Sequence, residues 1–137
     1  MRQLSEFIGL YNVTRTIEDR RANVQSRFEG RVLLSMSPRG AVYLEIGALI
    51  LDGKRFEAKR SYLWHEDGGH IFVRFADGRD FHNFDPVAGG LATTHLCGAD
   101  MYRGSYDLSD WPRWSVTWEA TGPRKNYQSV TTYIVAD

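Results

Sequence analysis

The sequence predicts an all-β protein that forms a single antiparallel up-and-down barrel of about nine or ten strands. Four turn sequences separate short segments of alternating polarity: SPRG at 37–40, LDGK at 51–54, EDGG at 66–69 and ADGR at 76–79. Asp-Gly between apolar runs is a strong hairpin signal. Sequential hairpins place neighbouring segments side by side, and closing the sheet removes its exposed edges.

The first half of the chain supplies the longest strands. Residues 1–7 predict a short helix or a loose lid, residues 9–17 a first strand, and residues 18–25 a polar connection. Side chains alternate across a strand, so one face of segment 27–37 should point inward. That face holds Phe28, Gly30, Val32, Leu34 and Met36. Segment 42–51 is apolar on both faces, and its pattern does not say which face points inward.

The second half continues the alternation in shorter pieces. Segment 55–65 has a polar face and a second face with Phe56, Ala58, Arg60, Tyr62 and Trp64. Segment 70–76 follows, with Ile71, Val73 and Phe75 expected inward. Further strands are expected over 80–85, 91–97, 100–106, 114–120 and 127–135.

Composition limits the class of protein. The 137 residues suit one domain, residues 1–137, and a hydrophobic fraction of 42% supports a core. Lys plus Arg equals Asp plus Glu at 17 each. This balance argues against nucleic acid and a polybasic membrane anchor as partners. No apolar run approaches the roughly 20 residues that span a bilayer.

The N-terminus and the cysteine content indicate the compartment. The first residues lack the apolar stretch and the cleavage site of a signal peptide. A single cysteine, Cys97, excludes an intramolecular disulfide, so we expect a cytoplasmic protein. We expect no cofactor. The oligomeric state stays open.

Two resemblances extend this interpretation. Gly9-Leu10-Tyr11 resembles a weakened lipocalin Gly-x-Trp start, and chain length and strand count are similar to the calycin group, which includes lipocalins and fatty-acid-binding proteins. Five patterns together resemble a family of small proteins known only by a domain-of-unknown-function label. They are Tyr43-x-Glu45-x-Gly47, Arg60-x-Tyr62-x-Trp64, Asp77-Gly78-Arg79-x-Phe81-His82, His95-x-Cys97-x-x-Asp100-x-Tyr102 and Gly122-Pro123-x-Lys125-x-Tyr127. This resemblance implies a calycin-like barrel and carries over no catalytic residue.

Arg60 is the first candidate for chemistry, because it lies on an otherwise apolar and aromatic strand face. A buried arginine is costly unless an anion pairs with it. The resemblance to fatty-acid-binding proteins, where interior arginine and tyrosine hold a carboxylate, implies a ligand as partner. Glu45 would be an internal partner if its face points inward. A β-bulge that turns Arg60 outward is the other alternative.

A second cluster contains two histidines. His82 shares a face with Phe84 and His95 with Cys97, and both could meet Asp100 and Tyr102 at one level of the cavity. An internal hydrogen-bond network, a ligand or proton-transfer site and a zinc site all fit these residue types. The spacing matches no known metal signature, so we expect no metal. For Cys97 we expect a buried, protonated thiol rather than a nucleophile.

The sequence therefore predicts binding of a small, partly apolar ligand with an anionic or polar end. Expected binding residues are Arg60, Tyr62, Trp64, His82, Phe84, His95, Tyr102 and Trp118, with Trp114 as further apolar wall. The alternative is a barrel lyase, isomerase or hydrolase with a histidine base and Arg60 as anion clamp. A protein-interaction module with a filled barrel is a third reading. A cavity of a few hundred Å³ would favour the first two.

Overall fold

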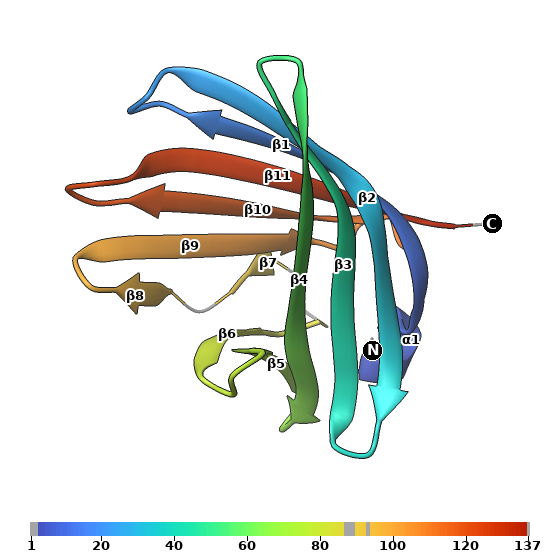
Figure 1. The fold of residues 1–137 in the computed structure, drawn as a ribbon. Coiled ribbons are helices and arrows are strands. Elements are labelled where there is room, and N and C mark those ends of the chain that lie inside the picture. The colour runs from blue at the N-terminus through green and yellow to red at the C-terminus, as the bar shows by residue number, and fades with distance from the viewer. Residues whose placement is uncertain (1–2, 87–89, 93, 137) are drawn as a thin grey trace.

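The computed structural model describes residues 3–86, 90–92 and 94–136, and it confirms the all-β prediction (Figure 1). Within these residues, one short helix precedes eleven strands. The elements are α1 (Leu4–Phe7), β1 (Gly9–Asp19), β2 (Val24–Ser37), β3 (Gly40–Leu51), β4 (Lys54–Asp67), β5 (His70–Phe75), β6 (Asp80–Phe84), β7 (Gly90–Leu91), β8 (His95–Cys97), β9 (Asp100–Asp107), β10 (Trp114–Thr121) and β11 (Asn126–Val135).

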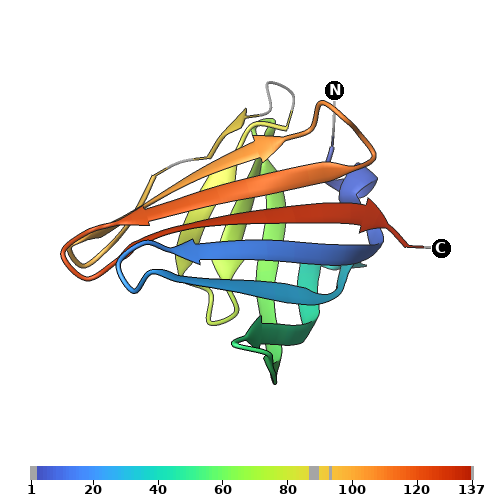
Figure 2. The same cartoon turned by 90° about the horizontal axis from the view of Figure 1, so that it is seen from above.

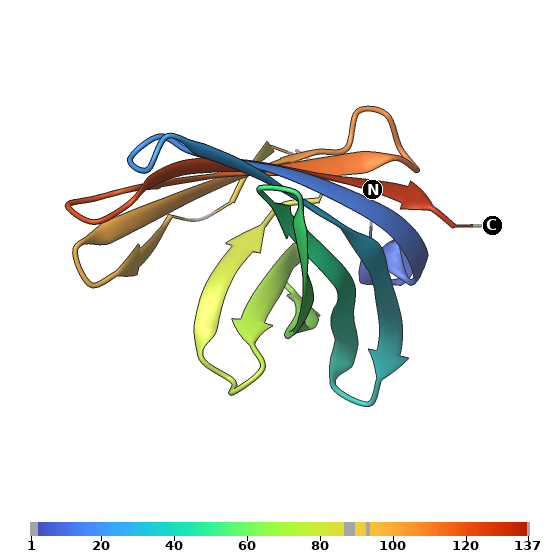
Figure 3. The same ribbon diagram turned by 45° about the horizontal axis from the view of Figure 1, so that its top comes forward.

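The strands form one antiparallel sheet with up-and-down connections. Its order is β6-β5-β4-β3-β2-β1-β11-β10-β9-β7, with β8 also paired to β9. The first and last strands of the chain, β1 and β11, pair over a long register from Tyr11–Val135 to Asp19–Tyr127. The sheet curves so that β5 and β6 face β10 and β11 from the other side of a nearly closed barrel (Figure 3).

The barrel closes along a seam between β6 and the strands β7 to β9. Both β7 and β8 pair with β9, one after the other, where the sequence predicted a single strand over 91–97. Among the described residues, Phe84 makes an isolated bridge to Ala92, whose N–H donates to the carbonyl of Gly104. Stacked rings of Phe84 and Tyr106, 3.8 Å apart, lie at the same end of the seam.

Helix α1 closes one end of the barrel (Figure 2), so the short helix of the two alternatives for residues 1–7 is present over Leu4–Phe7, while residues 1 and 2 lie outside the described residues. Phe7 is fully buried, and its ring meets the rings of Trp64, Phe84 and Trp114 edge-on at 5.4 to 6.1 Å. The N–H of Leu4 donates to the Glu66 carboxylate at the end of β4. Aromatic packing therefore fills this end, which leaves the other end for a site.

The structure settles which face of β3 points inward. Ala41, Tyr43 and Glu45 are buried, whereas Ile46 is exposed on the outer face. The inward prediction for Met36 is wrong, and Phe56, on the apolar face of its segment, is exposed as well. Met36 is exposed beside the β2–β3 turn, and Phe56 is exposed because the first part of β4 pairs with β3 alone and extends beyond the barrel wall.

Candidate functional site: the barrel cavity

A cavity of about 750 Å³ occupies the barrel on the side away from α1. Its lining comes from β1, β3 to β6 and β8 to β11, so residues distant in sequence share one chamber. Exposed side chains of Arg79, Asp80 and Cys97 belong to the lining and mark where it meets solvent. A filled barrel, as in the interaction-module reading, is not what the structure has.

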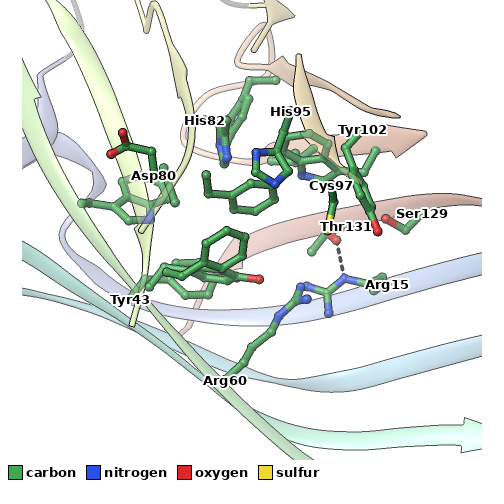
Figure 4. A pocket seen from close by; sticks show the side chains of 18 of the residues that line it. Arg15, Tyr43, Arg60, Asp80, His82, His95, Cys97, Tyr102, Ser129 and Thr131 are labelled. Atoms are coloured by element: carbon green, nitrogen blue, oxygen red, sulfur yellow. Dashed lines mark hydrogen bonds between the residues drawn. The ribbon is translucent and has the colours of Figure 1, made fainter. Parts of the chain in front are cut away.

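Three charged side chains form the polar centre of this cavity. Arg15 donates from two nitrogens to the two carboxylate oxygens of Glu45, at 3.0 and 2.6 Å, and from Nε to Thr131 at 2.7 Å. Nε of Arg60 lies 2.8 Å from Glu45 Oε2. Arg15 and Glu45 are almost fully buried, whereas the Arg60 side chain is 47% exposed. Figure 4 shows the two guanidinium groups approaching each other from β1 and β4.

The electrostatics keep Glu45 and Arg15 charged. Burial alone would raise the pKa of Glu45, but the hydrogen bond from Arg15 and the charge of Arg60 lower it overall. Burial likewise opposes the charge of Arg15, yet the contact with Glu45 raises the pKa of Arg15 above its ordinary value. One negative charge thus faces two positive charges, and the cluster has a net charge of about +1.

Two tyrosines extend the cluster as a hydrogen-bonded chain. The Tyr43 hydroxyl donates to Glu45 Oε1 at 2.9 Å and lies 2.7 Å from the Tyr133 hydroxyl. An ionised carboxylate can only accept hydrogen bonds, so the Tyr43 hydroxyl donates its hydrogen bond to Glu45. The Tyr133 hydroxyl must then be the donor to Tyr43. Neither tyrosine keeps its hydroxyl proton for a ligand.

Local register explains how the cluster forms. Glu45 and Arg60 are directly opposite on β3 and β4, so the pairing foreseen as an alternative for Arg60 is confirmed. Arg15 lies opposite Phe28, whose ring is 5.1 Å from its guanidinium carbon. That ring covers Gly30 and Gly47, where an added Cβ would come within 2.9 and 2.6 Å of it.

Arg15 is the member that sequence reasoning missed. The available signal was parity: Tyr11, Val13 and Arg15 share one face of β1, and all three are buried. An arginine on that face deserved the same argument as Arg60.

The two histidines point into the same cavity, as predicted, from β6 and β8 (Figure 4). His82 Nε2 lies 2.6 Å from the Tyr106 hydroxyl, and the Phe81 ring contacts both imidazoles edge-on, His82 at 4.5 Å and His95 at 5.3 Å. Burial, aided by the charge of His95, lowers the pKa of His82 to about 3. His82 is therefore neutral and a weak base near pH 7.

Of the other three residues of the expected polar cluster, two line the cavity and one does not. His95 packs against the Tyr102 ring at 6.0 Å, and both line the cavity. Asp100 lies 4.0 Å from Lys125, which also bonds the Tyr102 hydroxyl, and is not among the described lining residues.

A column of stacked rings lines the seam near the cavity mouth. The Phe81 ring stacks on Phe75 at 4.7 Å and on Trp118 at 5.0 Å, with interplanar angles of 15° and 19°. Trp118 lies flat on Gly104, where an added Cβ would meet three of its ring atoms at 2.7 to 2.8 Å. The column joins β5 and β6 to β10 by side chains, and Trp118 rests on the backbone of Gly104 in β9.

Most expected binding residues line the cavity. They are Arg60, Tyr62, Trp64, His82, His95, Tyr102 and Trp118. Phe84 does not; it packs with Phe7 and Trp64 near the closed end, and so does Trp114. Alternation identified their face correctly, but it does not tell how deep in the barrel a residue lies.

The expectation for Cys97 is wrong. Its side chain is exposed at the mouth rather than buried. The reason is that β8 has three residues and its described pairing is with β9 alone, so little structure covers the thiol.

No group of three or more His, Cys, Asp or Glu side chains within the described residues is arranged to hold a metal ion. The described helical residues likewise include no segment long and apolar enough to cross a bilayer.

Fold and site together define an antiparallel up-and-down β-barrel with an open, aromatic-walled cavity and an internal arginine–glutamate cluster. The chain belongs to a family of unknown function, DUF6314, whose model matches residues 7–135. The resemblance to an uncharacterised family is thereby confirmed. No curated protein matches the sequence.

Proposed function

We propose that this barrel binds a small, partly apolar ligand whose anionic end pairs with Arg60. The single observation that carries the proposal is the unequal use of the two arginines. All three guanidinium nitrogens of Arg15 donate to Glu45 or Thr131, whereas the shortest contact of Arg60 with Glu45 is made by Nε and the Arg60 side chain is 47% exposed. The outer nitrogens of Arg60 are left for a ligand, and an anion there would neutralise the excess positive charge.

The remaining cavity suits the apolar part of such a ligand. A volume of about 750 Å³ falls in the range of small-molecule pockets, which are mostly apolar with a few fixed polar groups. The likeness to calycin barrels and a cytoplasmic location belong to this proposal, as does the absence of nucleic-acid and membrane partners. In the enzyme alternative, with His82 or His95 as general base, a pKa of about 3 makes His82 a poor base and leaves His95 as the candidate.

Titration calorimetry with matched acids and alcohols tests the proposal. The probes are 2-naphthoate against 2-naphthalenemethanol and decanoate against decanol, so each pair differs in charge and keeps its apolar part. We expect at least one acid to bind more tightly than its alcohol. Arg60→Met should then weaken that acid by about tenfold or more, as loss of a charge-assisted hydrogen bond predicts.

Lys59→Met is the matched control. Lys59 is the preceding residue of β4, carries the same charge and is exposed on the outer face. It should leave every affinity unchanged. If neither acid is preferred over its alcohol, or if both variants weaken binding equally, the proposed function is wrong.

A further inference from the structure

We infer that the apolar part of the ligand is a planar aromatic ring system, so that the ligand is an aromatic carboxylate. This inference rests on the proposed function and names the chemical class that the same cavity selects. Its basis is the composition and rigidity of the wall.

Aromatic side chains dominate the wall. Among the described lining residues, Phe, Tyr and Trp outnumber the aliphatic ones, which are Ile17, Val73, Leu96 and Val116. Six of the rings are half-buried and so present part of their surface to the cavity: Tyr62, Phe75, Phe81, Tyr102, Trp118 and Tyr127.

The rings also hold one another in place. Phe81 lies between ring neighbours on two other strands, and Trp118 is pressed between Phe81 and the backbone of Gly104. Because faces within this column are used by stacking, the column offers ring edges to the cavity. Ring edges carry partial positive charge and prefer the face of another aromatic ring.

The path from the anion site to this column fits a compact ligand. The Arg60 guanidinium carbon lies 5.5 Å from the centre of the Tyr62 ring, and Tyr62 lies 5.8 Å from Phe81. A carboxylate on Arg60 would therefore place a directly attached one- or two-ring system over Tyr62 and against Phe81.

A flexible acyl chain would gain less from the same wall. Ordering a flexible group on binding costs free energy that a rigid group does not lose. A rigid planar acid keeps that advantage and matches a wall whose own rings are already immobilised. The cavity should thus discriminate by shape among acids of similar apolar size.

The test uses the wild-type protein with 2-naphthoate and decanoate in titration calorimetry. We expect 2-naphthoate to bind at least tenfold more tightly than decanoate. Phe81→Leu should reduce this ratio severalfold, because leucine removes the ring at the centre of the column. Phe72→Leu is the matched control: Phe72 is on β5, stacks on His65 and is not a described lining residue, so the ratio should stay as in wild type.

The outcomes separate this inference from the proposed function. If decanoate binds as tightly as 2-naphthoate and both depend on Arg60, the aromatic preference is wrong and the anion site stands. If neither acid binds, both proposals are wrong. The comparison of the two acids on wild-type protein decides the matter even if Phe81→Leu fails to fold, which near-ultraviolet circular dichroism would show.

Discussion

Replacing Glu45 by glutamine should destabilise the barrel strongly, because it leaves Arg15 charged and buried without an anion. The two side chains are only 8% and 3% exposed, and they share two hydrogen bonds of 3.0 and 2.6 Å. Removing one partner of a buried ion pair typically costs about 3 to 5 kcal/mol. Glutamine keeps the size of the side chain, so the loss reports charge rather than volume.

Glu29→Gln provides the control for that measurement. Glu29 pairs with Arg27 at 3.1 Å on the outer face, where the side chains are 44% and 57% exposed. Exposed pairs contribute about 0 to 1 kcal/mol. Urea unfolding of the two variants and wild type at pH 7 should therefore give a large loss for Glu45→Gln and almost none for Glu29→Gln. A difference between the variants below about 1 kcal/mol would refute the role assigned to the cluster.

The same cluster has a signed pH dependence. The pKa of Glu45 is lowered in the folded protein, so the unfolded chain takes up this proton first as pH falls below about 4.5. The stabilising contribution is present above pH 4.5 and is lost as pH falls through the folded-state pKa. Wild type should accordingly approach Glu45→Gln in stability under acid conditions, and a gap that widens there would contradict the assignment.

Three other predictions concern single positions. The imidazole of His82, with a pKa of about 3, should stay neutral from pH 8 to pH 5 in an NMR titration, and a titration midpoint above pH 5 would contradict this prediction. Because histidine in the unfolded chain binds a proton below about pH 6.5, the contribution of His82 to the free energy of unfolding should fall as pH drops from 6.5 toward 3. Cys97, being exposed, should react with iodoacetamide nearly as fast in native as in denatured protein, and strong native-state protection would count against the structure. Gly104→Ala should push Trp118 off its stacking position and cost about 1 to 3 kcal/mol, with a changed tryptophan emission spectrum; unchanged stability and emission would show that the contact is loose.

Turn chemistry and alternation were enough to predict the barrel and much of its interior. The Asp-Gly turns fixed the hairpins, and parity placed Arg60, Tyr62 and Trp64 on the inner face, where they line the cavity. Alternation did not predict which face of β3 points inward, because both faces are apolar. Only the structure shows that the face with Tyr43 and Glu45 is buried.

The errors share a physical cause. Alternation identifies a face, but depth along the strand decides whether that face is core, cavity or solvent. Phe84 lies too close to α1 to reach the cavity, Phe56 lies beyond the wall, and Cys97 belongs to a strand too short to be covered. Arg15 was missed for a different reason: the alternation argument that singled out Arg60 was not made for the first strand, on which Arg15 lies.

The side-chain column across the seam has a consequence for the order in which the wall loosens. In the described part of the chain, backbone pairing between β6 and the strands opposite is confined to the Phe84–Ala92 bridge. Along the rest of the seam, β6 has a described strand partner on one side only, β5, whereas β3 pairs over nearly its whole length with both β2 and β4. The amides of β6 and β8 should therefore exchange with deuterium well before those of β2 and β3. The seam should be the first part of the barrel to open by local unfolding.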